Sequence, residues 1–328
     1  MSEASTRAAA FVAAHQEQAR VLAGTLVDLT DDPEAFCPAL ERGLRELADP
    51  AFARMAERVS PNVPGNLAVR APLLEIITRQ LDLALGEGSS MDALRLAQRL
   101  IETPHRDLRL FALPCLRRAI AEDPELTWQL MRRMGHRAGD WVEVDGLADV
   151  WARGVLAEVF RWAELEQLVY AQQTYERRLV GATLATMPRR VAPDRRAGLR
   201  PAATARAFPL IALLMGDAEE MVQKALSWAV RAWTQVDADA AMAFLRAEAA
   251  IAVAQADGAR AWVIRDALSD QPPQVAAELR GRLAGLRRDR GAPSSSIAAG
   301  QAAPFAAVLS STGASADGQG RRYTRSPA

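Results

Sequence analysis

The sequence predicts an all-α protein, and three observations lead to this fold class. Alanine, leucine, arginine and glutamate dominate the composition, whereas the β-branched and aromatic residues that favour strands are sparse. Apolar residues recur at the spacing of one helix face in segment after segment, and only short breaks separate these segments. The chain has 328 residues, half of them hydrophobic, so it is long enough to bury a large core.

The expected helices are bounded by residues that start or stop helices. Asp31 and Asp32 precede a helix that begins with proline, and Ser90 can cap the helix after it. Pro104 and Pro124 fall in first turns, where a missing N–H costs nothing. Helices are expected near residues 6–26, 33–48, 50–58, 66–86, 91–102, 105–121, 124–135, 141–160, 163–187, 203–214, 218–233, 237–252, 259–269 and 273–288.

The middle of the chain shows the pattern of stacked helix pairs. Asp140 with Glu143 resembles a capping box that opens the helix at 141, and Pro114 is expected to kink the helix at 105. Antiparallel pairs of this length build a curved α-solenoid with a concave face. Two of the apolar stripes are Leu108, Ala112, Cys115, Ala119 and Leu147, Trp151, Val155, Val159.

Two segments differ from this pattern. Residues 188–206 hold six arginines against one aspartate, and their prolines indicate a loop inserted into the solenoid. The loop is either a solvated run of charge or an arm that reaches for phosphate. From about residue 290, Gly, Ala, Ser and Pro replace the periodic pattern, which predicts a disordered tail over 290–328. We therefore expect one helical repeat domain over residues 1–289.

Composition limits the classes of function. The formal net charge is zero, so an anion site must come from a local arrangement of residues. Cys37 and Cys115 lie in apolar helical contexts without metal spacing, and we expect buried free thiols. The scattered histidines His15, His105 and His136 indicate no metal site, and no motif calls for a cofactor. No signal peptide or membrane span is expected, which favours a cytoplasmic protein.

One short stretch places an aromatic side chain between two cations. Lys224, the only lysine, lies at helical spacing with Trp228 and Arg231. The apolar stripe of the same helix lies on the opposite face, so Trp228 points away from the expected core. A large aromatic side chain there calls for a ligand or a partner, although it could also pack on a neighbouring repeat. The apolar stripe is Val222, Leu226, Ala229 and Trp233.

Two further groups of residues can carry chemistry. Trp141 and Asp145 share a face at the start of a helix and border its apolar stripe. Arg177 and Arg178 lie on a later helical unit. Simpler interpretations exist, because a tryptophan can be a packing lid, an early aspartate can complement the helix dipole, and an arginine can form a surface ion pair.

The order of these groups resembles the AlkD-type DNA glycosylases, the DNA alkylation repair family built from HEAT-like helical repeats. The resemblance is strongest over residues 100–250, and it excludes the tail beyond 290. Tyr175 stands where family members often have tryptophan, so the wall of the cleft beside Arg178 is expected to differ. The segments that carry the resemblance are Val63–Arg70, more weakly, and Glu102–Arg106, Trp141–Asp145, Tyr175–Arg178 and Lys224–Arg231.

The resemblance implies a DNA glycosylase that removes cationic N3- and N7-alkylated purines from double-stranded DNA. It implies a concave face that binds DNA, catalytic residues at Trp141, Asp145 and Trp228, and a DNA contact at Arg178. We add Arg177, Lys224 and Arg231 as phosphate contacts. We expect a monomer without metal or organic cofactor. The alternative is a HEAT-like scaffold that binds DNA or protein without chemistry, or a helical protein that uses Trp228 to bind a partner.

Overall fold

The computed structural model describes residues 3–59, 63 and 65–304. Within this part of the chain the secondary structure is helical, and its only β-pairing is an isolated bridge between Ala48 and Val69. The all-α prediction is confirmed. The core helices are α1 (Glu3–Val27), α2 (Pro33–Glu46), α3 (Pro50–Val59), α4 (Ala71–Glu87), α5 (Ser90–Glu102), α6 (Arg106–Arg109), α7 (Ala112–Ala119), α8 (Pro124–Arg137), α9 (Trp141–Ala157), α10 (Trp162–Leu168), α11 (Thr174–Arg190), α13 (Phe208–Leu214), α14 (Glu220–Thr234), α15 (Ala238–Ala254), α16 (Gly258–Ala267) and α17 (Pro273–Arg282).

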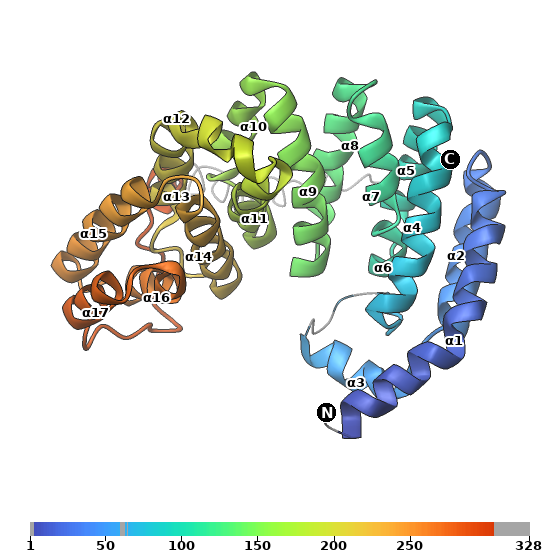
Figure 1. Cartoon of the computed structure of the whole chain (residues 1–328), viewed down its shortest axis with the longest axis horizontal. Coiled ribbons are helices and arrows are strands. Elements are labelled where there is room, and N and C mark those ends of the chain that lie inside the picture. The colour runs from blue at the N-terminus through green and yellow to red at the C-terminus, as the bar shows by residue number, and fades with distance from the viewer. Residues whose placement is uncertain (1–2, 60–62, 64, 305–328) are drawn as a thin grey trace, which may run out of the picture.

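The helices form two layers along an arc (Figure 1). Helices α7, α9, α11, α14 and α16 follow one another along the inner layer, and α8, α10, α13 and α15 lie outside them. Each outer helix packs on the inner helix that follows it in the sequence, so the repeating unit is an antiparallel pair. The two ends of the arc, at α1 and α17, turn towards the same side, which gives the molecule the curved solenoid shape that the sequence predicts.

The core lies between the two layers, and glycines let the helices approach closely. A side chain at Gly181 of α11 would place its Cβ 2.9 Å from the backbone of Ala225 in α14. A Cβ at Gly154 of α9 would lie 2.7 Å from the ring of Trp128, which packs edge-on against Trp151. Gly181 therefore sets the spacing of α11 and α14, and Gly154 sets the spacing of α8 and α9.

The caps confirm most of the predicted helix starts. The Asp32 carboxylate accepts from the N–H of Ala35, and the Asp140 carboxylate accepts from the N–H of Glu143. The predicted cap at Ser90 is wrong by one residue, because Ser89 accepts from the first N–H groups of α5. The hydroxyl of Ser90 donates instead to Asp123, in the neighbouring repeat.

Two predicted helices are each divided. The expected helix 105–121 breaks between α6 and α7, where the carbonyl of Leu110 accepts from Leu113. Pro114 explains the break, since it has no N–H for Leu110 and its ring would collide with that carbonyl. The expected helix 163–187 breaks between α10 and α11. There the carbonyls of Ala171 and Gln172 accept from the Arg177 side chain.

The arginine-rich segment 188–206 is not the loop that the sequence predicts. Helix α11 continues to Arg190, and the rest forms a 3-10 helix (Pro193–Leu199), the short helix α12 (Arg200–Ala202) and a π-helical turn (Ala203–Ala207). Proline is tolerated at Pro193 and Pro201 because both lie in first turns, where no N–H is needed.

The predicted tail is ordered over its first residues. The N–H of Ser295 donates to the carbonyl of Gly216, and its hydroxyl donates to Asp257 at 2.5 Å. Residues 297–304 are helical. The composition suggested disorder because these residues lack an apolar stripe, whereas serine hydroxyls and backbone groups attach them to the start of α16. The remainder of the predicted tail, 305–328, lies outside the described residues.

Both cysteines are buried free thiols, as predicted, and burial raises the pKa of Cys37 to about 11 and that of Cys115 to about 12. In the described part of the chain no helix combines the length and the apolar character that a membrane crossing requires.

Candidate functional site

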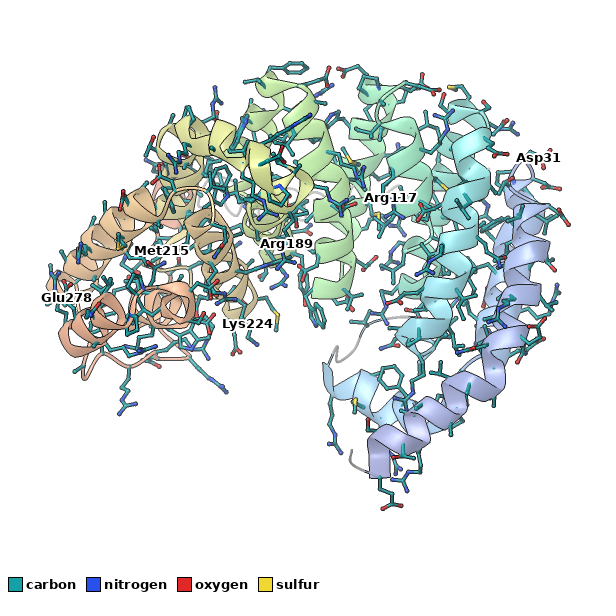
Figure 2. All side chains as sticks on the ribbon, in the orientation of Figure 1. Asp31, Arg117, Arg189, Met215, Lys224 and Glu278 are labelled. Carbon is teal, nitrogen blue, oxygen red and sulfur yellow. The ribbon has the colours of Figure 1, made fainter. Side chains whose placement is uncertain are left out.

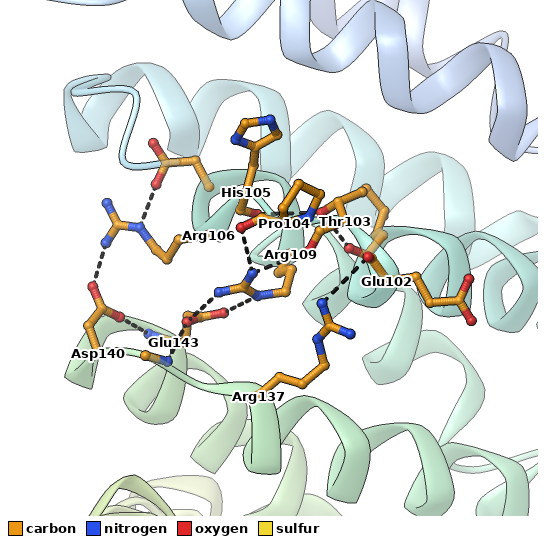
Figure 3. Close-up of polar contacts among 12 residues, drawn as sticks. Glu102, Thr103, Pro104, His105, Arg106, Arg109, Arg137, Asp140 and Glu143 are labelled. Carbon is orange, nitrogen blue, oxygen red and sulfur yellow. Dashed lines mark hydrogen bonds and ion pairs between the residues drawn. The ribbon is translucent and has the colours of Figure 1, made fainter. Parts of the chain in front are cut away.

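The first two turns of α9 carry Trp141 and Asp145, and two arginines of α6 fix the start of this helix (Figure 3). Arg106 donates to Asp140 at 2.9 Å, and Arg109 forms a bidentate ion pair with Glu143 at 2.6 and 2.9 Å. Of the predicted capping box, the bond from the Glu143 N–H to the Asp140 carboxylate forms, whereas the Glu143 carboxylate accepts from the N–H of Gly139, one residue before the cap. The turn is therefore held by buried charges before any ligand binds.

Asp145 is held from the other side by α11. Arg178 donates to its two carboxylate oxygens at 3.0 and 2.7 Å, and a third donor of Arg178 reaches the carbonyl of Met221 at 2.6 Å. Arg178 is only 6% exposed, so the predicted DNA contact is a buried link that joins α9, α11 and α14. Its bidentate geometry fixes the orientation of the carboxylate.

The Asp145 carboxylate is available to a ligand on one side. The Asp145 side chain is 24% exposed, and Trp141, one turn earlier, is partly exposed. Burial raises the pKa of Asp145 above its usual range, while the ion pair with Arg178 opposes that rise. Tyr175 lies in the first turn of α11, three residues before Arg178, and is also partly exposed.

Arg177 has a different environment from its neighbour. It forms an ion pair with Asp217 at 2.7 Å and donates to the carbonyls of Ala171 and Gln172 at 3.0 and 2.8 Å. Arg109 makes the same set of contacts two repeats earlier, with Glu143 and the carbonyls of Thr103 and Pro104. The repeated arrangement favours a structural role for Arg177 over the predicted contact with DNA.

Lys224 and Arg231 lie on α14, in different surroundings. Lys224 is 46% exposed and pairs with Glu220 one turn earlier at 2.8 Å. Figure 2 shows its side chain on the inner side of the arc. Arg231 donates to the carboxylate of Asp266 at 2.7 Å and to its carbonyl at 3.0 Å. Both cations are near the surface, where a phosphate can compete for them.

Trp228 lines a pocket of about 280 Å³ between α14 and the arginine-rich segment. The guanidinium of Arg189 lies over its ring, 5.3 Å from the centroid. Trp141 and Asp145 are not among the lining residues, so the structure brings Asp145 and Arg178 together but places Trp228 in a separate pocket. The lining residues are Pro188, Arg189, Arg196, Trp228, Arg231, Ala232, Gln235 and Asp270.

Sequence reasoning missed three arginines that shape this region. Arg190 forms an ion pair with Asp149, one turn beyond Asp145 on α9. Arg189 and Arg196 surround Trp228. The signal in the sequence was the density of arginines over 188–206. Their positions could not be inferred from spacing, because the prolines predicted a loop, whereas the segment is helical.

The arrangement suits stabilisation of positive charge. A fixed carboxylate beside an indole can interact with a cationic group and orient a water molecule. Arg189 of α11 and Lys224 of α14 are exposed cations that an anion can contact in a chain of zero net charge. Among the described residues, no three His, Cys, Asp or Glu side chains gather as ligands for a metal ion.

Comparison with known proteins identifies one family. Residues 40–270 match the model of a family described as DNA alkylation repair enzyme. The matched region covers well over half of the chain and includes α9, α11 and α14. A comparison with curated proteins gives no match.

Proposed function

Because the chain belongs to the DNA alkylation repair enzyme family, we propose that it is a DNA glycosylase. It hydrolyses the N-glycosidic bond of purines that carry an alkyl group at N3 or N7. The observation that carries this proposal is the Asp145 carboxylate, which Arg178 fixes while its side chain stays partly exposed, one helical turn from Trp141.

The chemistry needs charge stabilisation more than acid catalysis. An N3- or N7-alkylated purine is already cationic, so the bonding electron pair can leave with the base and make it neutral. The sugar then carries oxocarbenium-like positive charge, which a fixed carboxylate stabilises. Water adds to C1′ and loses its proton to solvent or to Asp145, which completes the hydrolysis.

The two tryptophans have distinct roles in this proposal. Trp141 lies one turn before Asp145, where its indole face can meet the cationic base. Trp228, in the pocket beside Arg189, contacts the sugar-phosphate backbone of the damaged strand. Lys224 and Arg231 contact phosphates on the same strand without reading sequence. Double-stranded DNA is thus the proposed substrate.

One observation favours the second candidate, a DNA-binding scaffold without activity. Arg178 already neutralises Asp145 in the free protein, as it would in a purely structural pair. The two functions differ in one product. The protein is incubated with duplex DNA that contains N7-methylguanine, and free base is measured by chromatography against a protein-free control. Base release above the control supports the glycosylase, whereas DNA binding without base release identifies the scaffold.

A further inference from the structure

We propose that the pocket beside Trp228 is a phosphate site that the arginine-rich segment adds to the DNA-binding surface. Three arginines line it, against the single carboxylate of Asp270. Its volume of about 280 Å³ lies at the small end of ligand pockets, which suits one sugar-phosphate unit of a DNA strand. This inference rests on the proposed function, because it takes DNA as the ligand.

Arg189 is the residue best placed to bind a phosphate. It is exposed, and within the described residues its one recorded interaction is the contact with the Trp228 ring. The contact with the ring holds the guanidinium near the pocket, and among the described residues no hydrogen bond of its N–H groups is recorded. An arginine held in this way can donate two parallel hydrogen bonds to a phosphate.

The other two arginines are anchored by their surroundings. Arg196 donates from Nε to the carbonyls of Pro188 and Val191, which fixes its guanidinium at the wall of the pocket. Arg231 donates from Nη1 to Asp266. Anchored donors lose little conformational freedom when a ligand arrives, which favours binding.

The helical structure of the segment explains why these arginines converge. Pro188 lies in the last turn of α11. The 3-10 helix that begins at Pro193 folds back, so that the Arg196 side chain donates to the carbonyl of Pro188. A solvated loop would spread the same charges over many conformations. Arg195, the neighbour of Arg196, is exposed and does not line the pocket, so it provides a matched control within the same segment.

The test uses the salt dependence of DNA binding. Affinity for a duplex with a stable abasic-site analogue is measured from low to moderate salt for the wild type, Arg189→Gln, Arg196→Gln and Arg195→Gln. Each lost phosphate contact is expected to reduce the slope of log K against log salt by about 0.9. We expect that reduction for Arg189→Gln and an unchanged slope for Arg195→Gln. Arg196→Gln should follow Arg189→Gln if its helix content is unchanged by circular dichroism.

An unchanged slope for Arg189→Gln, or an equal loss for Arg195→Gln, would overturn the pocket as a phosphate site. Base release from N7-methylguanine DNA is measured with the same proteins. A wild type that releases base while Arg189→Gln keeps the full slope rejects only the pocket. A wild type that releases no base while Arg189→Gln loses slope rejects only the glycosylase.

Discussion

The start and the end of helix α11 use arginine in opposite ways. At the start, Arg178 is buried and donates to Asp145 and to the carbonyl of Met221. At the end, Arg189 is exposed and lies on the face of Trp228. The buried arginine fixes a carboxylate, and the exposed arginine keeps its donors available. Both residues are arginines of the same helix, so their burial and their partners decide what each one does.

The largest difference between the two ends of α11 is expected in the effect of a substitution on stability. Arg178→Gln leaves Asp145 without its buried counter-charge and is expected to lower the free energy of unfolding by about 3 kcal/mol. Arg189→Gln removes an exposed side chain and should change it by less than about 0.5 kcal/mol. Urea unfolding followed by circular dichroism measures both. Equal effects would mean that Arg178 is not the buried anchor described here.

The close approach of α11 and α14 should be nearly as sensitive. Gly181→Val places methyl groups against the backbone of Ala225, and overpacking of this kind costs about 1–3 kcal/mol. Gly198→Ala is the control, since nothing lies within 4 Å of a Cβ there. Thermal unfolding of the two variants compares them, and a wild-type transition for Gly181→Val would contradict the packing.

The pH dependence of base release tests the state of Asp145. Burial raises its pKa in the folded protein, and the protonated acid cannot stabilise the sugar cation. Activity, measured as kcat/KM, should therefore rise with pH through a pKa above about 3.9, the ordinary value for aspartate. Because the ion pair with Arg178 lowers this pKa, Arg178→Gln should move the acid limb to higher pH. An acid limb of Arg178→Gln at the same pH as that of the wild type would show that Arg178 does not control the protonation of Asp145 during catalysis.

The same shift affects stability with a definite sign. A folded-state pKa above the unfolded value means that the folded protein binds this proton more tightly. The resulting contribution to stability is present below the unfolded pKa and is lost as pH rises through the folded pKa. Asp145→Asn should remove this part of the pH dependence of unfolding.

The smallest effect is expected at Lys224. Its side chain is 46% exposed and paired with Glu220, so Lys224→Gln should leave stability within about 0.5 kcal/mol of the wild type. The salt-dependence slope of DNA binding should fall by about 0.9 if Lys224 contacts one phosphate. An unchanged slope would place Lys224 outside the DNA contact surface.

Periodicity and caps predicted the helical repeats, because an amphipathic stripe and an aspartate at a helix start are local features. The pairing of Asp145 with Arg178 was not predicted, since it joins residues 33 positions apart through the stacking of two helices. The ordering of 188–206 and 290–304 was missed for a related reason. Their contacts, such as Arg206 with Glu166 and Ser295 with Gly216, depend on tertiary structure that composition does not encode.

The central claim is that Asp145 performs the chemistry and does not merely support the fold. The direct test is single-turnover base release from N7-methylguanine DNA by Asp145→Asn, with Asp149→Asn as the matched control one turn along α9. Asp145→Asn should reduce the rate by about 100-fold or more, while its DNA affinity and the rate of the control remain near the wild-type values. A rate for Asp145→Asn equal to that of the wild type would contradict the claim.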